Sequence, residues 1–427
     1  MLIHVVKPGD TVYSIALEYG IPMSQLILDN GLETSSRLAV GQALVVQFPT
    51  QTHTVHPGET LASIAAAYQL PLRQLYRNNP ILGGIPEIYP GQTLVLAYDS
   101  TPEATLSVNG YAYPFIDPAL LQSTVPYLTY LTPFTYGFTP DGTLVELDDE
   151  ALLAAARQGG AAPLMHLSTL TEEGGFSNEL AHLALTQPAV QDTLVDNLEA
   201  MLVQKGYRGL DVDFEYVYAE DAGAYAAFLG RLTERLNPLG YPVIAALAPK
   251  IAADQPGTLY EGHDFAAIGA AVNQVLLMTY EWGYTYGPPM AVAPINKVRE
   301  VLDYAVTEIP NEKIDMGIPN YGYDWALPFQ RGITRADSIS NPQAVQIAVE
   351  NNAIIQFDEV AMSPFFEYRK DGVDHIVWFE DARSIYAKLR LIEEYNFRGA
   401  GYWNIMKPFR QNWLLANALF RITPGNI

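Results

Sequence analysis

The chain has 427 residues, of which 49% are hydrophobic and 17% are charged. This length and composition predict a globular protein of two or three domains that buries a sizeable core. The net charge of −23 argues against a nucleic-acid or anionic-membrane partner. The absence of cysteine excludes disulfides, thiol catalysis and zinc–thiolate sites.

Neither a membrane span nor a secretory signal is predicted. No stretch has the roughly 18 uninterrupted apolar residues that a span needs. Residues 1–8 lack the basic head and the apolar run of a signal peptide. We therefore expect no membrane partner and no export directed from this end of the chain.

An internal repeat fills the first hundred residues. The segment His4–Val12 returns as His53–Leu61, and each copy continues with two short helical patterns and a strand. In each copy a Pro-Gly turn precedes an acid and a threonine, Asp10-Thr11 or Glu59-Thr60, which suit the cap of the first helix. Each copy therefore predicts a βααβ unit, over residues 1–48 and 51–98.

Both repeats resemble LysM modules. That resemblance implies binding of N-acetylglucosamine-containing glycans in a groove between the first strand–helix loop and the second helix–strand loop. In this chain the loops are residues 9–12 with 31–38, and 58–61 with 79–88. The implied glycan-binding residues are Gly9, Asp10, Thr11, Gly58, Glu59 and Thr60. The alternative of modules that serve protein contacts alone stays open, and histidines 4, 53 and 56 are expected on the strand surface and not as metal ligands.

Residues 103–427 have the size of a (β/α)8 barrel. Short β-rich runs alternate with helical ones, as a parallel sheet with crossover helices requires. Strands are predicted near residues 106–112, 128–138, 162–168, 209–215, 243–249, 275–281, 314–319 and 399–404. Helices are predicted at 148–157, 189–205, 222–237, 296–308 and 381–395. The fold class is therefore α/β, a TIM barrel preceded by two small modules.

The segment from about 328 to 379 interrupts the last repeat of the barrel. It contains a hairpin signal in which Asp371-Gly372 forms the turn. We interpret it as a small α+β insertion beside the predicted cleft.

Three carboxylates recur at every second position in Asp211, Asp213 and Glu215, with apolar residues between them. In a strand these acids point to one face. Like charges held close resist ionising together, and a carboxyl that keeps its proton can act as a general acid. The alternative is an acidic, solvated edge strand, but Gly209 and the apolar partners are typical of a buried parallel strand.

Aromatic and polar residues gather at several other predicted strand ends. Examples are residues 278–284, 317–322 and 401–404. Chemistry in such barrels takes place at the C-terminal ends of the strands, and aromatic rings suit the C–H faces of sugars. Singly, each ring is more often part of the core; together they indicate a site.

The acid triplet after Gly-Leu resembles the Asp-x-Asp-x-Glu signature of glycoside hydrolase family 18. The run from Met278 to Glu281 resembles that family's Met-x-Tyr-Asp motif, and Trp403 fits the tryptophan below its central sugar. With two LysM copies in front, the arrangement is similar to the spore-cortex-lytic N-acetylglucosaminidases of endospore-forming bacteria.

The chain departs from the family pattern at a few positions. Arg208 stands where the longer signature begins with Asp, and Glu281 replaces the usual Asp of the sixth-strand motif. The third-strand region around His166 lacks the usual Ser-x-Gly-Gly, although Gly174 and Gly175 follow. His166 is either a residue of the cleft or a histidine of the barrel core.

The resemblance implies a role for each matching residue. Glu215 would be the acid and then the base, Asp213 would hold the substrate's acetamide, and Asp211 would share a proton with Asp213. Tyr280 would orient the acetamide oxygen. Further substrate contacts are implied for Glu281, Trp282, Asn320, Tyr321 and Trp403. No metal and no organic cofactor is implied.

These observations predict a retaining β-N-acetylglucosaminidase that acts on spore-cortex peptidoglycan and is held there by its LysM modules. Two alternatives stay open: a chitinase of the same family, and a non-catalytic wall-binding or coat lectin. We expect a monomer located in the spore coat, cortex or cell wall.

Overall fold

The computed structural model describes the chain except residues 33–36, 101, 103, 172–173 and 426–427. The two N-terminal repeats each form a βααβ unit whose two strands pair antiparallel. Module 1 contains β1 (Leu2–Val5), α1 (Val12–Tyr19), α2 (Met23–Asp29) and β2 (Ala43–Val46). Module 2 contains β3 (Pro49–Thr54), α3 (Leu61–Ala67), α4 (Leu72–Asn78) and β4 (Thr93–Tyr98).

The third unit is a nearly closed barrel of parallel strands, as predicted. Its third strand is divided into β9, which pairs with β6, and β10, which pairs with β11. In chain order the strands are β5 (Thr105–Ala112), β6 (Tyr130–Pro133), β9 (Ala162–Pro163), β10 (Met165–Ser168), β11 (Leu210–Asp213), β12 (Val243–Leu247), β13 (Gln274–Leu277), β14 (Ile314–Pro319) and β20 (Gly399–Trp403). The circuit returns through pairing of β20 with β5.

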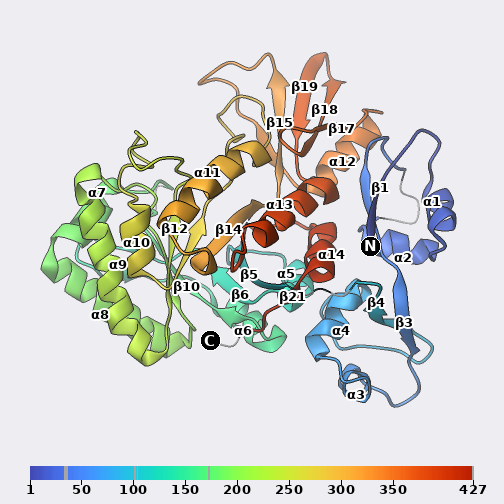
Figure 1. The fold of residues 1–427 in the computed structure, drawn as a ribbon, viewed down its shortest axis with the longest axis horizontal. Helices are drawn as coiled ribbons and strands as arrows, with labels where there is room; N and C mark the ends of the chain where they lie inside the picture. Colours follow the sequence, from blue (N-terminus) through green and yellow to red (C-terminus); the bar gives the residue numbers. More distant parts are fainter. Residues whose placement is uncertain (33–36, 101, 103, 172–173, 426–427) are drawn as a thin grey trace.

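Helices surround the barrel (Figure 1). They are α5 (Pro118–Thr124), α6 (Glu150–Gly159), α7 (Asn178–Thr186), α8 (Pro188–Lys205), α9 (Ala222–Leu236), α10 (Phe265–Ala271), α11 (Ile295–Glu308), α13 (Ala382–Glu394) and α14 (Arg410–Leu419). Each predicted barrel helix is present, and the sequence prediction missed α5, α7, α10 and α14. All four are short, and α14 is buried on most of its surface with polar residues among the buried ones, so their periodic signal is weak. Among the described residues, no helix combines the length and the apolar character needed to cross a membrane.

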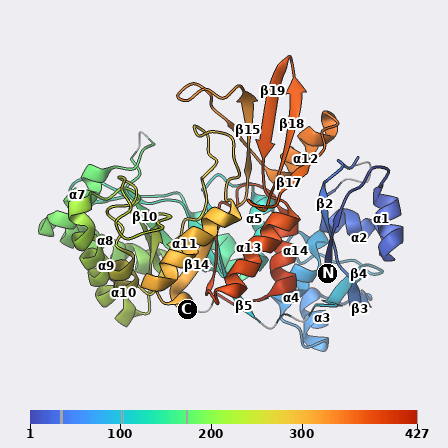
Figure 2. The same cartoon turned by 45° about the horizontal axis from the view of Figure 1, so that its top comes forward.

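The insertion is a five-stranded antiparallel sheet with one helix, and it rises beside the barrel (Figure 2). Its elements are β15 (Gly322–Leu327), β16 (Asp337–Ile339), α12 (Asn341–Glu350), β17 (Gln356–Asp358), β18 (Ser363–Lys370) and β19 (Val373–Trp378). The sheet starts at Gly322, earlier than the expected 328. The hairpin turn is the expected Asp371-Gly372, with φ of 51° and 82°.

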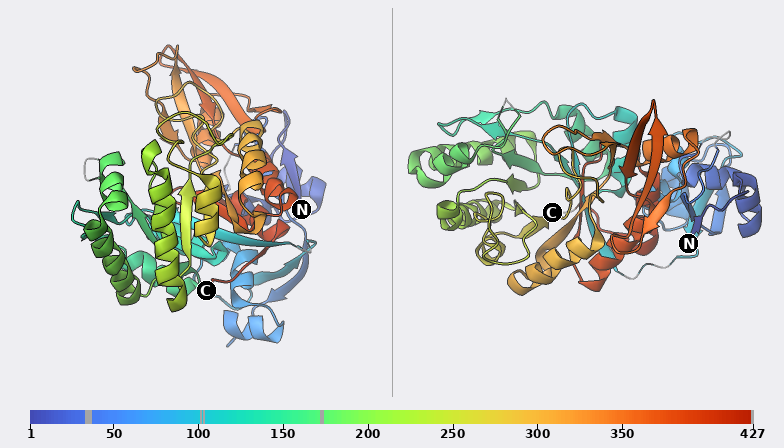
Figure 3. Two further views of the ribbon diagram at one scale, coloured as in Figure 1. Left: turned by 60° about the vertical axis from the view of Figure 1, so that its left-hand side comes forward. Right: turned by 90° about the horizontal axis from the view of Figure 1, so that it is seen from above.

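Both LysM modules lie against the barrel on the side of α14 (Figures 1 and 3). Arg410 Nη1 donates to Leu28 O of module 1 at 2.6 Å. Near the other end of α14, Asn417 Oδ1 accepts from Gln74 Nε2 of module 2 at 3.0 Å. Helix α14 therefore contacts the second helix of each module.

Candidate active site at the end of strand β11

The acid triplet lies where β11 ends. Asp211 and Asp213 are buried residues of the strand, but β11 ends at Asp213. The prediction that one regular strand carries all three acids is therefore wrong for Glu215, which follows the strand and is partly exposed. Similarly, β13 ends at Leu277, so Tyr280 and Glu281 also follow their strand.

The residue before Glu215 anchors this turn of the chain. Phe214 is fully buried, and its ring stacks on Tyr225 with centroids 5.6 Å apart. His263 Nδ1 accepts from the Ala248 amide at 3.0 Å, so its proton is on Nε2 and donates to Phe214 O at 2.9 Å. Burial lowers the pKa of His263 to about 4, which keeps the ring neutral. The position of Glu215 is thus fixed by a histidine that the sequence did not identify.

Burial is the main reason why the three acids hold protons. It raises the pKa of Asp211 to about 7, with a smaller contribution from the charge of Asp315. Burial also raises the pKa of Asp213 well above its usual value, and the charges of Glu215 and Asp211 are the next largest causes of this rise. For Glu215 burial and then the charge of Glu281 raise the pKa to about 7. The sequence argument assigned this effect to like charge, which is the smaller cause.

The triplet lacks a compensating cation. In the described part of the chain, no lysine or arginine forms an ion pair with any of the three acids. Asp211 Oδ2 accepts a 2.5 Å hydrogen bond from Tyr111 OH, while Oδ1 of Asp211 and Oδ1 of Asp213 have no hydrogen-bond partner there. Unpaired buried carboxyls are costly and are typical of functional sites.

His166 lies next to the acids and is also buried. Its Nε2 is 3.7 Å from Asp213 Oδ2, and its Nδ1 is 2.7 Å from Thr135 Oγ1. Burial lowers its pKa to about 3, so the ring is neutral and gives Asp213 no positive charge. His166 is therefore a histidine of the barrel core that borders the acids, and its position in the substrate cleft stays a prediction.

The ring of Tyr280 packs directly against the backbone of Gly317 in β14. A Cβ on Gly317 of β14 would lie 2.7 Å from Tyr280 Cε1, so glycine is needed for the ring to pack there. Burial and then the charge of Asp213 raise the pKa of Tyr280 well above its usual value. The hydroxyl therefore stays protonated and can donate a hydrogen bond.

Glu281 connects this end of the barrel to the insertion. Its carboxylate accepts from the hydroxyls of two buried tyrosines, Tyr321 and Tyr323, the latter at 3.0 Å. Its backbone has a φ of 66°, which is uncommon for a residue with a side chain. Lys407 Nζ lies 5.7 Å from the Tyr321 ring. The side chain of Glu281 is thus held by Tyr323 of β15 and by Tyr321, which lies just before that strand.

Trp403 lies among aromatic rings at the end of β20. Its centroid is 4.8 Å from Phe134 and 6.1 Å from both Tyr111 and Tyr113. Burial and then the charge of Glu215 raise the pKa of Tyr113. Sequence reasoning missed Tyr111 and Tyr113; the only available signal was an aromatic pair at the end of the first predicted strand.

The two other predicted contacts have structural partners. Asn320 is buried, and its Nδ2 donates to the carbonyls of Asn404 at 3.2 Å and Lys407 at 2.8 Å. Its Oδ1 has no partner among the described residues. Trp282 is partly buried and packs against the edge of the barrel core.

The predicted LysM residues stabilise their own modules. Thr11 and Thr60 cap α1 and α3, as expected. Their acidic neighbours do not cap the helix: Asp10 Oδ2 accepts from the Lys7 amide and lies 3.0 Å from His4 Nε2. Glu59 does the same with His56 N and His53. His4 is buried, so the expectation of a strand-surface histidine is wrong there.

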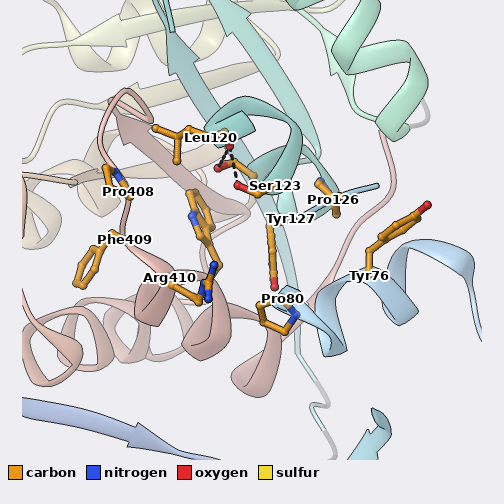
Figure 4. A pocket seen from close by; sticks show the side chains of 12 residues that line it. Tyr76, Pro80, Leu120, Ser123, Pro126, Tyr127, Pro408, Phe409 and Arg410 are labelled. Carbon is orange, nitrogen blue, oxygen red and sulfur yellow. Dashed lines mark hydrogen bonds between the residues drawn. The ribbon is translucent and has the colours of Figure 1, made fainter. Parts of the chain in front are cut away.

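Two cavities lie at the junctions of the modules with the barrel, away from the acids. One, of 70 Å³, lies between α4 of module 2 and the barrel, with Tyr76, Pro80, Leu120, Tyr127 and Arg410 among its lining residues (Figure 4). The other, of 830 Å³, lies between module 1, α12 and α14. Within the described ranges, no group of three or more His, Cys, Asp or Glu is arranged to hold a metal ion.

Comparison with known proteins assigns this arrangement to a family. The sequence pattern of glycosyl hydrolases family 18 matches residues 123–407, and that of the LysM domain matches 4–47 and 53–97. The chain belongs to glycosyl hydrolases family 18. It is a glycoside hydrolase that carries two LysM domains at its N-terminal end.

The similarity to known relatives extends over the whole chain. It is 42% identical to the cortical fragment-lytic enzyme of Bacillus subtilis (strain 168) over 99% of both chains. It is 40% identical to the enzyme of that name in Bacillus anthracis over 98% of both chains. The crystal structure of the Bacillus cereus spore cortex-lytic enzyme SleL superposes with a TM-score of 0.85 at 37% identity, covering 100% of this chain and 99% of that one.

Proposed function

We propose that this family 18 enzyme hydrolyses spore-cortex peptidoglycan at the β-1,4 bond after N-acetylglucosamine. The observation that carries the proposal is full-length similarity to cortical fragment-lytic enzymes, which includes both LysM modules. The three acids have no lysine or arginine partner among the described residues, and they support the chemistry because a carboxyl with a pKa of about 7 can donate a proton near neutral pH.

The first step would use Glu215 as the acid. Its proton passes to the glycosidic oxygen as the bond from that oxygen to the anomeric carbon breaks. The carbonyl oxygen of the sugar's own N-acetyl group forms the new bond to the anomeric carbon, giving an oxazolinium ion. Asp213 accepts from the acetamide N–H, and the protonated Tyr280 hydroxyl donates to the acetamide oxygen and aims it.

The second step would use the same residue as the base. The Glu215 carboxylate takes a proton from water while the water oxygen attacks the anomeric carbon and opens the ring. Two displacements on one carbon retain the β configuration. Asp211 shares a proton with Asp213, and Tyr111 holds Asp211 in place. Trp403 and Glu281 would contact the sugar rings and their hydroxyls.

The relatives' names and the LysM modules support an association with the spore or cell wall. Binding of the modules to an insoluble polymer would raise the enzyme's concentration at its substrate. Chitin contains the same sugar, so it is the natural comparison substrate.

The test is mass spectrometry of the products released from cortex peptidoglycan fragments and from chitin oligomers. Wild type and Glu215→Gln are compared. We expect cortex fragments that end in reducing N-acetylglucosamine, released by wild type alone. Cleavage of chitin alone would keep the mechanism but contradict the cortex assignment, and binding without cleavage of either polymer would favour the lectin alternative.

A further inference from the structure

The loops that lead into the last strand of each LysM module have the same internal structure. Gln42 Oε1 accepts from the Ala39 amide, and Gln92 Oε1 accepts from the Tyr89 amide, both at 3.1 Å. Gly41 and Gly91 have φ of 85° and 89°. Ala39 and Tyr89 are therefore equivalent positions, and differences between them reflect what surrounds each module.

In module 1 this loop is packed against the insertion. Ala39 is 5% exposed and belongs to a core cluster with Ile355. Ile355 N donates to Val40 O at 2.9 Å, and Arg383 Nη2 donates to Gly41 O at 3.1 Å. A Cβ on Gly41 would lie 1.9 Å from Ile355 O. From Ala39 to Gly41 this loop is therefore covered by the insertion, whereas Gly31, Leu32 and Arg37 line the 830 Å³ cavity between module 1, α12 and α14.

In module 2 most of the equivalent loop faces solvent. Tyr89 is 70% exposed and Ile85 is 41% exposed. A Cβ on Gly91 would have no heavy atom within 4 Å, whereas Gly84, at the near end of the loop, lies against Gln122 of the barrel. The free part of the loop therefore extends from Ile85 to Gly91.

The other wall of the groove does not distinguish the modules. Gly9 and Gly58, in the first strand–helix loops, are both exposed, and a Cβ on either would have open space around it. Among the described residues, the modules thus differ in the second loop, where Ala39 of module 1 is covered by the insertion and Tyr89 of module 2 is exposed.

We infer that the two repeats have separate roles, in which module 2 binds the glycan polymer through its Ile85–Gly91 loop and module 1 holds the insertion against the barrel. The inference rests on the proposed function for the identity of the polymer. Tyr89 offers a ring face that suits the C–H face of N-acetylglucosamine. Module 1 supports the insertion that in turn holds Glu281 through Tyr321 and Tyr323.

Polymer binding tests the role of module 2. Sedimentation with insoluble cortex peptidoglycan is measured for the full chain carrying Glu215→Gln, so that hydrolysis does not interfere. Tyr89→Ala is compared with Tyr13→Ala, which removes the 65% exposed tyrosine of module 1. We expect Tyr89→Ala to weaken binding by about tenfold, as loss of an anchoring aromatic does, and Tyr13→Ala to change it by less than about twofold. Melting temperatures confirm that both variants are folded.

Any of three results would overturn glycan binding by module 2. These are equal losses in the two variants, a loss in Tyr13→Ala alone, or no binding of the parent chain to any GlcNAc polymer. The outcome is separate from that of the proposed function, because binding is read without turnover. A wild type that binds through Tyr89 but releases no product would contradict the proposed function and leave the separate roles of the modules intact.

A matched glycine pair tests the role of module 1. Gly41→Ala and Gly91→Ala carry the same cost of a positive φ, so the difference between them reports packing against Ile355. We expect Gly41→Ala to lower the melting temperature clearly more than Gly91→Ala, and to make the insertion more accessible to proteases. Equal melting temperatures and equal cleavage would contradict the docking role of module 1.

Discussion

Asp149 and the pair Asp211 and Asp213 are buried carboxylates of the same barrel that have opposite surroundings. Asp149, just before α6, accepts from Tyr136 OH at 2.6 Å, from Tyr207 OH, and from Lys205 Nζ at 2.6 Å. The charge of Asp149 is thus balanced by a lysine and two hydroxyl donors, as is typical of an acid with a structural role. Asp211 and Asp213 have fewer hydrogen-bond donors, with one tyrosine hydroxyl between them, and no lysine or arginine partner in the described chain. This difference predicts that the two groups respond to mutation in opposite ways.

The largest effect is expected for the acid itself. Glu215→Gln removes the transferable proton while keeping the side chain's shape, so kcat should fall by about 10³-fold or more. The melting temperature should not fall, because an ionisable group that resists charging is removed. The measurement is the rate of reducing-end release from cortex fragments. The control is Glu220→Gln, which makes the same change at an exposed glutamate shortly after Glu215 in the chain. This variant should behave as wild type.

Asp213→Asn should reduce activity and spare stability. The amide cannot balance charge on the substrate's acetamide, and kcat should fall by about 10²-fold. Burial penalises the charged form of Asp213, so the neutral variant should melt at the same temperature or higher. Thermal unfolding and initial rates on one sample check both. A lower melting temperature would show that Asp213 has a structural role.

Asp149→Asn should give the reverse result. The change removes the nearer of the two carboxylates that pair with Lys205, whose side chain is 12% exposed, and leaves only Glu150 Oε1 at 3.6 Å among the described residues. Breaking such a pair costs about 3 kcal/mol of unfolding free energy. The rate per folded molecule should stay near that of wild type, because Asp149 does not contact the triplet. Denaturant unfolding measures the loss, and a kcat that falls as in Asp213→Asn would contradict the comparison.

The triplet should also make stability depend on pH. The pKa of Asp211 is about 7 in the folded chain and near 4 when unfolded, so between these values the folded state binds more protons. Stability should therefore fall as pH rises from about 4 to about 7, by up to about 4 kcal/mol for this group. In Asp211→Asn the fall should be shallower. Denaturant midpoints across this range test the slope, and an unchanged slope would exclude Asp211 as its source.

The smallest effect is expected for Tyr111→Phe. Its hydroxyl is the donor that lowers the pKa of Asp211, so its removal should raise that pKa further. We expect kcat to fall several-fold and the pH–activity profile to shift to higher pH, without loss of polymer binding. A profile identical to wild type would show that this hydrogen bond only supports packing.

The sequence predicted those elements that depend on residues close together in the chain. The alternation around Val212 revealed β11, and the paired Asp-Gly revealed the hairpin of the insertion. It could not show that the chain leaves the strand before Glu215, because that turn depends on His263 and on rings from other elements. Tyr111 was missed for the same reason: it meets Asp211 across 100 positions of sequence.

The repeats show the same limit. The two copies looked alike, and one shared function was the natural expectation. Ala39 and Tyr89 occupy equivalent positions, but the insertion covers only the first. A short side chain in one copy and an aromatic ring in the other was a visible difference, although its meaning required knowing that Ile355 lies against module 1.

The most direct test of the mechanism is the configuration of the first product. Proton NMR during the first minutes of cortex-fragment hydrolysis distinguishes the two anomers before they interconvert. Attack by the substrate's N-acetyl group, followed by water, predicts that the β anomer appears first and that N-deacetylated fragments are not cleaved. Initial release of the α anomer, or cleavage of deacetylated substrate at the normal rate, would contradict the role given to the acid triplet.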